Sequence, residues 1–164
     1  MNAYDSEPWR EFAVGTGGAA AALVGLLFVA ISINLQAIIK LPHIPIRAAH
    51  ALVVLATPVF LALILLIPQE AVPLGIEMIV AAVIAGPLVG WLAAPTHRSR
   101  DTPPAAWALL VIGPAVALAL GPLLAGIGVL TTSLGGLYWI PAAMVVALLS
   151  GLFNAWVLMI EIIR

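Results

Sequence analysis

The polar residues inside the long apolar runs of this chain are its candidates for chemistry, because a polar group in hydrocarbon is costly. Ser150 and Asn154 stand four apart in the last run, and Glu161 follows on the same helical face. Ser32 and Gln36 have the same spacing in the first run. If both runs cross a membrane in the same direction, these residues reach a similar depth. We therefore expect one polar cluster made of Ser32, Gln36, Ser150, Asn154 and Glu161.

Two interpretations of this cluster are open. It could form a hydrated vestibule or an ion site, or it could join two helices through hydrogen bonds worth roughly 0.6 kcal/mol each. We favour the second interpretation because Asn and Ser commonly link membrane helices. It predicts a hydrogen bond from Asn154 to the Ser32 and Gln36 face of the first helix, while Asn34 points away from that face.

The other titratable residues define no reaction. Glu77 lies about one turn into the third run, where the helix dipole favours a carboxylate. An alternative is a cation-attracting mouth formed with Glu70. His43, His50 and His97 fall in the expected connections, where His43 and His50 make at most a weak metal pair.

Composition excludes several classes of function. The chain has no cysteine, and no phosphate-binding loop, Ser-His-Asp set or pair of catalytic carboxylates can be placed in it. The net charge is −1, which gives no basic surface for nucleic acid. We expect a protein that is not an enzyme and that binds no cofactor, metal or nucleic acid.

Long apolar runs must position all of these residues. The chain has 164 residues, of which 64% are hydrophobic and 8% charged. A membrane-crossing helix needs about 20 residues. The expected fold is an all-α integral membrane protein: one domain over residues 1–164, with a bundle of five transmembrane helices at 13–39, 51–67, 73–94, 105–129 and 136–163.

Basic residues predict the orientation. With five crossings, the first connection, the third connection and the C-terminus share one face. Arg10 is the only basic residue on the opposite face. The positive-inside rule then places the N-terminus outside and the C-terminus in the cytoplasm. The shared face carries Lys40, Arg47, Arg98, Arg100 and Arg164.

Small residues recur every four positions in the first and last helices. Residues four apart share a helix face, and small residues let two membrane helices approach closely. We expect these two helices to touch along such stripes, within one protomer or between two. The stripes are Gly17, Ala21 and Gly25 in the first helix, and Ala143, Ala147, Gly151 and Ala155 in the last.

Proline lies inside the three middle helices, at Pro58, Pro87, Pro114 and Pro122. Each removes a backbone donor, so kinks are expected there. A broken helix could line an ion or substrate site. We favour ordinary membrane-helix proline, which is common.

Three stretches together resemble a group of small bacterial membrane proteins that is frequent in actinobacteria and sometimes labelled "modulator of FtsH protease". They are Phe12–Leu35, Pro42–Leu55 with the sequence PHIPIRAAHALVVL, and the tail Gly136–Arg164. The resemblance covers most of the chain and is clearest at its two ends. It implies an accessory role in the bacterial inner membrane and supplies no catalytic residues.

These observations predict a non-enzymatic, multi-pass accessory or modulator subunit of the bacterial inner (plasma) membrane. Its partners would be the lipid bilayer and either a second copy of itself or another membrane protein, contacted through helices. The alternative is a small homo-oligomeric channel or transporter for ions or small solutes.

Overall fold

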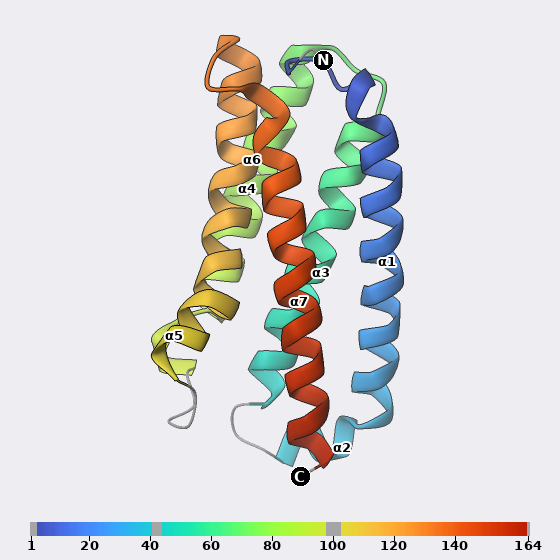
Figure 1. Cartoon of the computed structure of the whole chain (residues 1–164), viewed down its shortest axis with the longest axis vertical. Helices are drawn as coiled ribbons and strands as arrows, with labels where there is room; N and C mark the ends of the chain where they lie inside the picture. The colour runs from blue at the N-terminus through green and yellow to red at the C-terminus, as the bar shows by residue number, and fades with distance from the viewer. Residues whose placement is uncertain (1–2, 41–43, 98–102, 164) are drawn as a thin grey trace.

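The computed structural model describes residues 3–40, 44–97 and 103–163, with the side chains of residues 97 and 161–163 excepted. All regular structure in these ranges is helical (Figure 1). In chain order the elements are η1 (Glu7–Trp9), α1 (Arg10–Ile33), α2 (Leu35–Lys40), α3 (Ile44–Leu66), α4 (Ala71–Leu92), η2 (Pro95–His97), α5 (Pro104–Trp107), the π-helical segment η3 (Ala108–Ile112), α6 (Gly113–Thr131), η4 (Gly136–Tyr138) and α7 (Trp139–Ile163).

Five helical stretches of the described chain are long and apolar enough to cross a membrane. Each spans at least 22 residues, enough for a hydrocarbon core that needs about 20. The prediction of an all-α fold with five apolar helices is confirmed. The stretches are Glu7–Ile33, Ile44–Leu66, Ala71–Leu92, Pro104–Thr131 and Gly136–Ile160.

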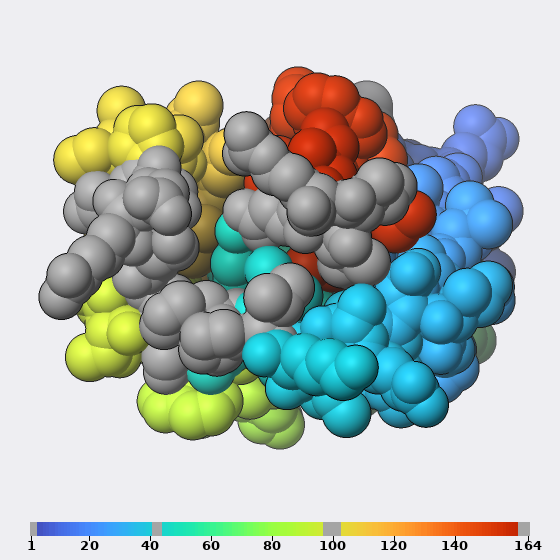
Figure 2. Space-filling view, turned by 90° about the horizontal axis from the view of Figure 1, so that it is seen from below, coloured from blue at the N-terminus to red at the C-terminus, as the bar shows by residue number. Residues whose placement is uncertain are grey.

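The helices form two groups joined by the central helices α3 and α7. Helix α1 packs mainly on α3, and α4 packs mainly on α6. Helix α7 contacts both α3 and α6. Figure 2, viewed along the bundle, shows α1 and α2 on one side and α4 and α5 on the other. Helix α1 begins at the opposite end of the bundle from the end of α7 (Figure 1).

Glycine permits the close approach of α4 and α6. A Cβ on Gly126 would lie 2.5 Å from the carbonyl oxygen of Gly75. A Cβ on Gly75 would in turn lie 2.7 Å from Cγ of Leu130. Such contacts replace the hydrophobic effect as the force that joins helices in lipid.

Among the five membrane-length helices, the two largest differences from the predicted boundaries are the end of the first helix and the start of the second. The first helix stops at Ile33 rather than continuing to residue 39, because the Asn34 side chain donates to the Ala30 carbonyl at 2.9 Å and competes with the helical backbone. The second helix begins at Ile44, seven residues before the expected start at 51. Pro45 does not prevent this, because the first turn of a helix needs no donor from proline.

The N-terminal segment packs against the connection between α6 and α7. Trp9 is buried, and its ring meets that of Tyr138 edge-on at a centroid distance of 5.0 Å. The backbone N–H of Leu137 donates to the carbonyl of Ala3 at 2.8 Å. These contacts tie the start of α1 to the start of α7.

Candidate functional site

At the start of the fourth membrane-length helix, a proline leaves one backbone carbonyl without its helical hydrogen-bond donor. In the π-helical segment, the N–H of Gly113 donates to the carbonyl of Ala108, one residue further back than in an α-helix. The next residue, Pro114, has no N–H to donate to Leu110, its α-helical partner four residues earlier. The Leu110 carbonyl therefore needs a donor from elsewhere.

Two side chains of α7 supply that donor. Ser150 Oγ donates to the Leu110 carbonyl at 3.1 Å, and Asn154 Nδ2 donates to it at 2.7 Å. Asn154 Nδ2 also lies 3.0 Å from the carbonyl of Ser150. Both side chains are buried. Asn154 thus bonds across helices as predicted, but its partner is a backbone carbonyl of the fourth membrane-length helix rather than Ser32 or Gln36 of the first.

His50 of α3 reaches the same segment from a third helix. It is only 3% exposed and hydrogen-bonds to the backbone of Val111. Among the described residues, its Nε2 atom has no hydrogen-bond partner. Sequence reasoning missed this residue because it placed His50 in a connection, outside a helix expected to start at 51. The sequence did hold a signal for it: His50 lies between apolar residues, which would allow the helix to begin before residue 51.

The polar contacts around η3 hold its backbone in place. His50, Ser150 and Asn154 come from α3 and α7 and converge on the adjacent carbonyls of Leu110 and Val111. No group of three His, Cys, Asp or Glu side chains in the described part of the chain could hold a metal ion. This geometry supports the interpretation of Ser150 and Asn154 as groups that join helices. Of the other two histidines, His43 and the side chain of His97 lie outside the described residues.

The remaining members of the expected polar cluster lie apart from this site. Ser32 is exposed and donates to the Phe28 carbonyl of its own helix at 2.8 Å. Gln36 is exposed in α2, beyond the end of α1. The predicted cluster across the first and last helices is therefore wrong for these two residues, because α3 stands between α1 and most of α7. The side chain of Glu161 lies outside the described residues.

The small-residue stripe of α7 is a packing face, but its partners are α3 and α6. A Cβ on Gly151 would lie 2.5 Å from Cγ of Leu55 in α3. The Ala143 methyl group lies against Gly121 in α6, where a Cβ would be 2.6 Å away. The four residues of the stripe are buried, except for the half-buried last one: Ala143, Ala147, Gly151 and Ala155.

Only the first residue of the small-residue stripe of α1 faces the bundle. Gly17 approaches α3, where a Cβ would lie 2.6 Å from Cβ of Ala62. Ala21 and Gly25 are exposed. Each four-residue step turns about 40° around a helix of 3.6 residues per turn, so the stripe leaves the contact after Gly17. Within the protomer, the predicted contact of the two stripes is wrong.

Between residues 15 and 25, the side of α1 that points away from the bundle is built of small residues. Gly15, Gly18, Ala22 and Gly25 are all exposed and lie within about 80° of the helix circumference. We call them the outward face of α1. A Cβ on any of its three glycines would meet no described heavy atom within 4 Å.

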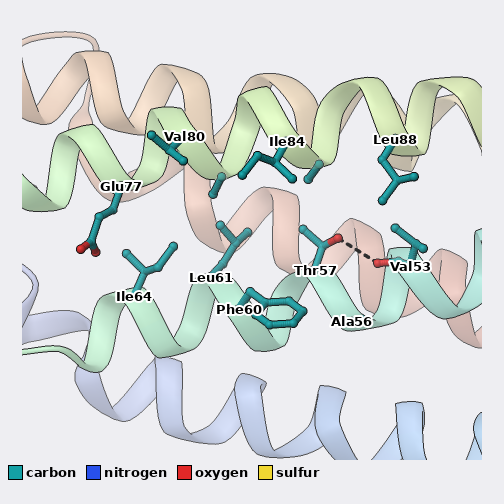
Figure 3. Close-up of a pocket in the computed structure, with 12 residues that line it drawn as sticks. Val53, Ala56, Thr57, Phe60, Leu61, Ile64, Glu77, Val80, Ile84 and Leu88 are labelled. Atoms are coloured by element: carbon teal, nitrogen blue, oxygen red, sulfur yellow. Dashed lines mark hydrogen bonds between the residues drawn. The ribbon is translucent and has the colours of Figure 1, made fainter.

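Glu77 lies at one end of an apolar groove between α3 and α4 (Figure 3). Gln69 Nε2, from the connection between these helices, donates to Glu77 Oε2 at 2.8 Å. The groove has a volume of about 490 Å³. Glu70 is exposed at the N-cap of α4, whereas Glu77 is half-buried and turned toward α3 (Figure 3). The groove is lined by Val53, Ala56, Thr57, Phe60, Leu61, Ile64, Glu77, Val80, Ala81, Ile84, Ala85 and Leu88.

Comparison with known proteins gave no match: no protein-family model, curated protein or solved structure matches this chain.

Proposed function

We propose that this protein is a non-enzymatic, membrane-embedded accessory subunit that acts through helix–helix contact along the outward face of α1. A second copy of the chain is the simplest partner, and another membrane protein is the other. The observation that carries the proposal is the open surface over Gly15, Gly18 and Gly25.

Glycine inside a helix needs a reason. It costs about 0.5–1 kcal/mol relative to alanine because its backbone is more flexible in the unfolded chain. At Gly17 and Gly151 a neighbouring helix would collide with a Cβ, so the fold itself requires glycine there. At Gly18 and Gly25 nothing in the described part of the protomer requires it. A helix that packs from outside would supply the missing reason, because small residues let two membrane helices approach closely.

The proposed setting is a bacterial inner membrane, with the N-terminus outside and the C-terminus in the cytoplasm. Lys40 and Arg47 lie at the end of the bundle where α2 ends and α3 begins, whereas Arg10 lies at the other end. The positive-inside rule assigns the first of these ends to the cytoplasm. The resemblance to small bacterial membrane proteins supports an accessory role in the same membrane.

Energy transfer between labelled protomers tests the proposal. Because the chain has no cysteine, Ser133→Cys in the exposed connection gives one site for a donor or acceptor dye. The test variant is Gly25→Leu. The matched control is Gly90→Leu on α4, where a Cβ would also meet no described atom within 4 Å. The labelled protein is reconstituted into vesicles at decreasing protein-to-lipid ratios. Energy transfer should persist for the wild type and the control. For the test variant it should fall to the level expected from chance proximity of unassociated protomers.

If the partner is another membrane protein, the wild type and the two glycine variants should differ in co-purification instead. A foreign membrane protein would then co-purify in mild detergent with the wild type and with Gly90→Leu, but not with Gly25→Leu. The proposal fails if the wild type shows neither specific transfer nor a co-purifying partner. It also fails if Gly25→Leu behaves as Gly90→Leu does in both measurements.

A further inference from the structure

The fourth membrane-length helix changes in burial at Pro114. Residues 104–112, which make up α5 and η3, include no buried residue. Burial begins directly after them, at Pro114, Ala115 and Leu118 of α6. Helix α5 contacts mainly η3, whereas α6 packs on α4 and α7. Figure 1 shows α5 at the edge of the bundle, and we call residues 104–112 the arm.

Two features weaken the backbone where the arm meets α6. The N–H of Gly113 reaches back five residues to Ala108, as in a π-helix. Pro114 has no N–H to offer the Leu110 carbonyl. Prolines and π-helical turns are the usual causes of sharp bends in helices, and a hinge needs only a few such residues at the end of an element. Gly113 and Pro114 therefore provide a hinge.

Apolar contact alone does not fix the arm in a membrane. Lipid chains are as apolar as a leucine side chain, so an apolar arm loses little when it exchanges helix contacts for lipid contacts. Backbone carbonyls differ, because hydrocarbon offers them no hydrogen-bond donor. The polar bonds between the arm and the bundle therefore control its position.

Three buried side chains of other helices bond to the arm. Ser150 and Asn154 of α7 donate to the Leu110 carbonyl at 3.1 and 2.7 Å. His50 of α3 hydrogen-bonds to the backbone of Val111. We call His50, Ser150 and Asn154 the latch. They are three of the five buried polar or charged residues in the described part of the chain, so most of the buried polar groups bond to one segment that is itself not buried.

We propose that the arm is a lid, hinged at Gly113 and Pro114 and held closed by the latch. When the latch bonds break, the arm swings outward from α7 and uncovers the three latch side chains at the end of the bundle where α2 lies. The Leu110 carbonyl is about 9 Å along the helix from Pro104, so water from this end satisfies it once the arm has moved.

The buried imidazole of His50 makes the open state accessible. In the closed arrangement its Nε2 atom has no hydrogen-bond partner among the described residues. A buried polar atom without a partner is costly, so a bond from Nε2 to water in the open state offsets part of the cost of breaking the latch. This inference is independent of the outward face of α1.

Distances between two spin labels test the proposal on the full chain in lipid nanodiscs. Because the chain has no cysteine, Ser32→Cys on α1 and Ala105→Cys on the arm give two exposed labelling sites on opposite sides of the bundle (Figure 2). The opening variant combines Ser150→Ala and Asn154→Leu. It should raise the ratio of long to short distances about five- to tenfold, the effect of losing two membrane hydrogen bonds of average strength.

Matched controls separate release of the arm from general loosening of the bundle. Thr57→Val removes another buried hydroxyl, but one that donates within α3 to the Val53 carbonyl at 2.8 Å, so its distances should equal those of the wild type. Pro114→Ala, added to the opening variant, supplies the N–H that a regular helix offers to Leu110 and should return a single narrow distance. Pro122→Ala replaces another proline of the same helix and should leave the long distances in place.

Asn154→Leu alone covers the case in which the double variant does not fold, because Ser150 still donates to the Leu110 carbonyl. It should raise the ratio of long to short distances about threefold. The proposal is overturned if the folded latch variants give the same distances as Thr57→Val. It is equally overturned if Pro122→Ala narrows the distances as Pro114→Ala does, since added helix stability anywhere would then explain the effect.

Discussion

Adding one methyl group at Gly151 should destabilise the bundle measurably. A Cβ there would lie 2.5 Å from both Cγ and Cδ2 of Leu55. Leu55 is 1% exposed, so it has no free space into which to move. Overpacking a core costs about 1–3 kcal/mol, and alanine recovers up to about 1 kcal/mol of helix propensity. We expect Gly151→Ala to lower the free energy of unfolding by about 1–2 kcal/mol.

The assay is unfolding by SDS in mixed micelles, followed by the fluorescence of the five tryptophans. The matched control is Gly90→Ala, because a Cβ on Gly90 meets no described atom within 4 Å. This control changes only helix propensity, so it should leave stability unchanged or raise it by up to about 1 kcal/mol. The comparison separates steric collision from the general effect of replacing glycine.

Shortening Leu55, the residue that the new methyl group would meet, tests whether steric collision causes the loss of stability. Leu55→Ala alone should cost about 2–5 kcal/mol, because it leaves a cavity. Combined with Gly151→Ala, the new methyl group enters that space, so the pair should cost about 1 kcal/mol less than the sum of the two single changes. Strictly additive costs, or a Gly151→Ala variant as stable as Gly90→Ala, would show that the collision does not control this packing.

Three further outcomes are expected from the rest of the structure. Asn154→Leu should cost less than about 2 kcal/mol in the same unfolding assay, because Ser150 still donates to the Leu110 carbonyl, and adding Ser150→Ala should cost more than the two separate changes predict. His50→Met should cost about 1–3 kcal/mol, because it removes the hydrogen bond to the Val111 backbone and leaves that group without its partner. Reporter fusions should find the N-terminus outside and the C-terminus in the cytoplasm, and two cytoplasmic ends would contradict the five-helix topology.

The number and type of the helices could be predicted because they depend on local sequence. Five apolar runs of membrane length leave the backbone little choice but a helix, since hydrocarbon offers no hydrogen bonds to an open backbone. The ends of the helices were harder to predict. The break at Asn34 depends on a side-chain hydrogen bond to Ala30 that composition does not reveal. The earlier start of α3 depends on how Ile44 and Ala48 pack in the core.

The packing partners could not be predicted from periodicity. The small stripe on α7 was found, because burial of Ala143 and Gly151 follows the spacing of residues on one face. Periodicity does not say which helix fills the space above that face. In the structure α3 provides Leu55 and α6 provides Gly121, and α1 contributes little.

The sequence by itself determined an all-helical chain with five membrane-length segments, because helix formation in apolar runs is a local property. It also identified Asn154 as a residue that bonds across helices, since a buried amide needs a partner. Only the tertiary structure decided that this partner is the Leu110 carbonyl freed by Pro114, and that His50 reaches the next carbonyl from α3. Such contacts join residues far apart in sequence, and they depend on which helices lie side by side and how each is rotated about its axis.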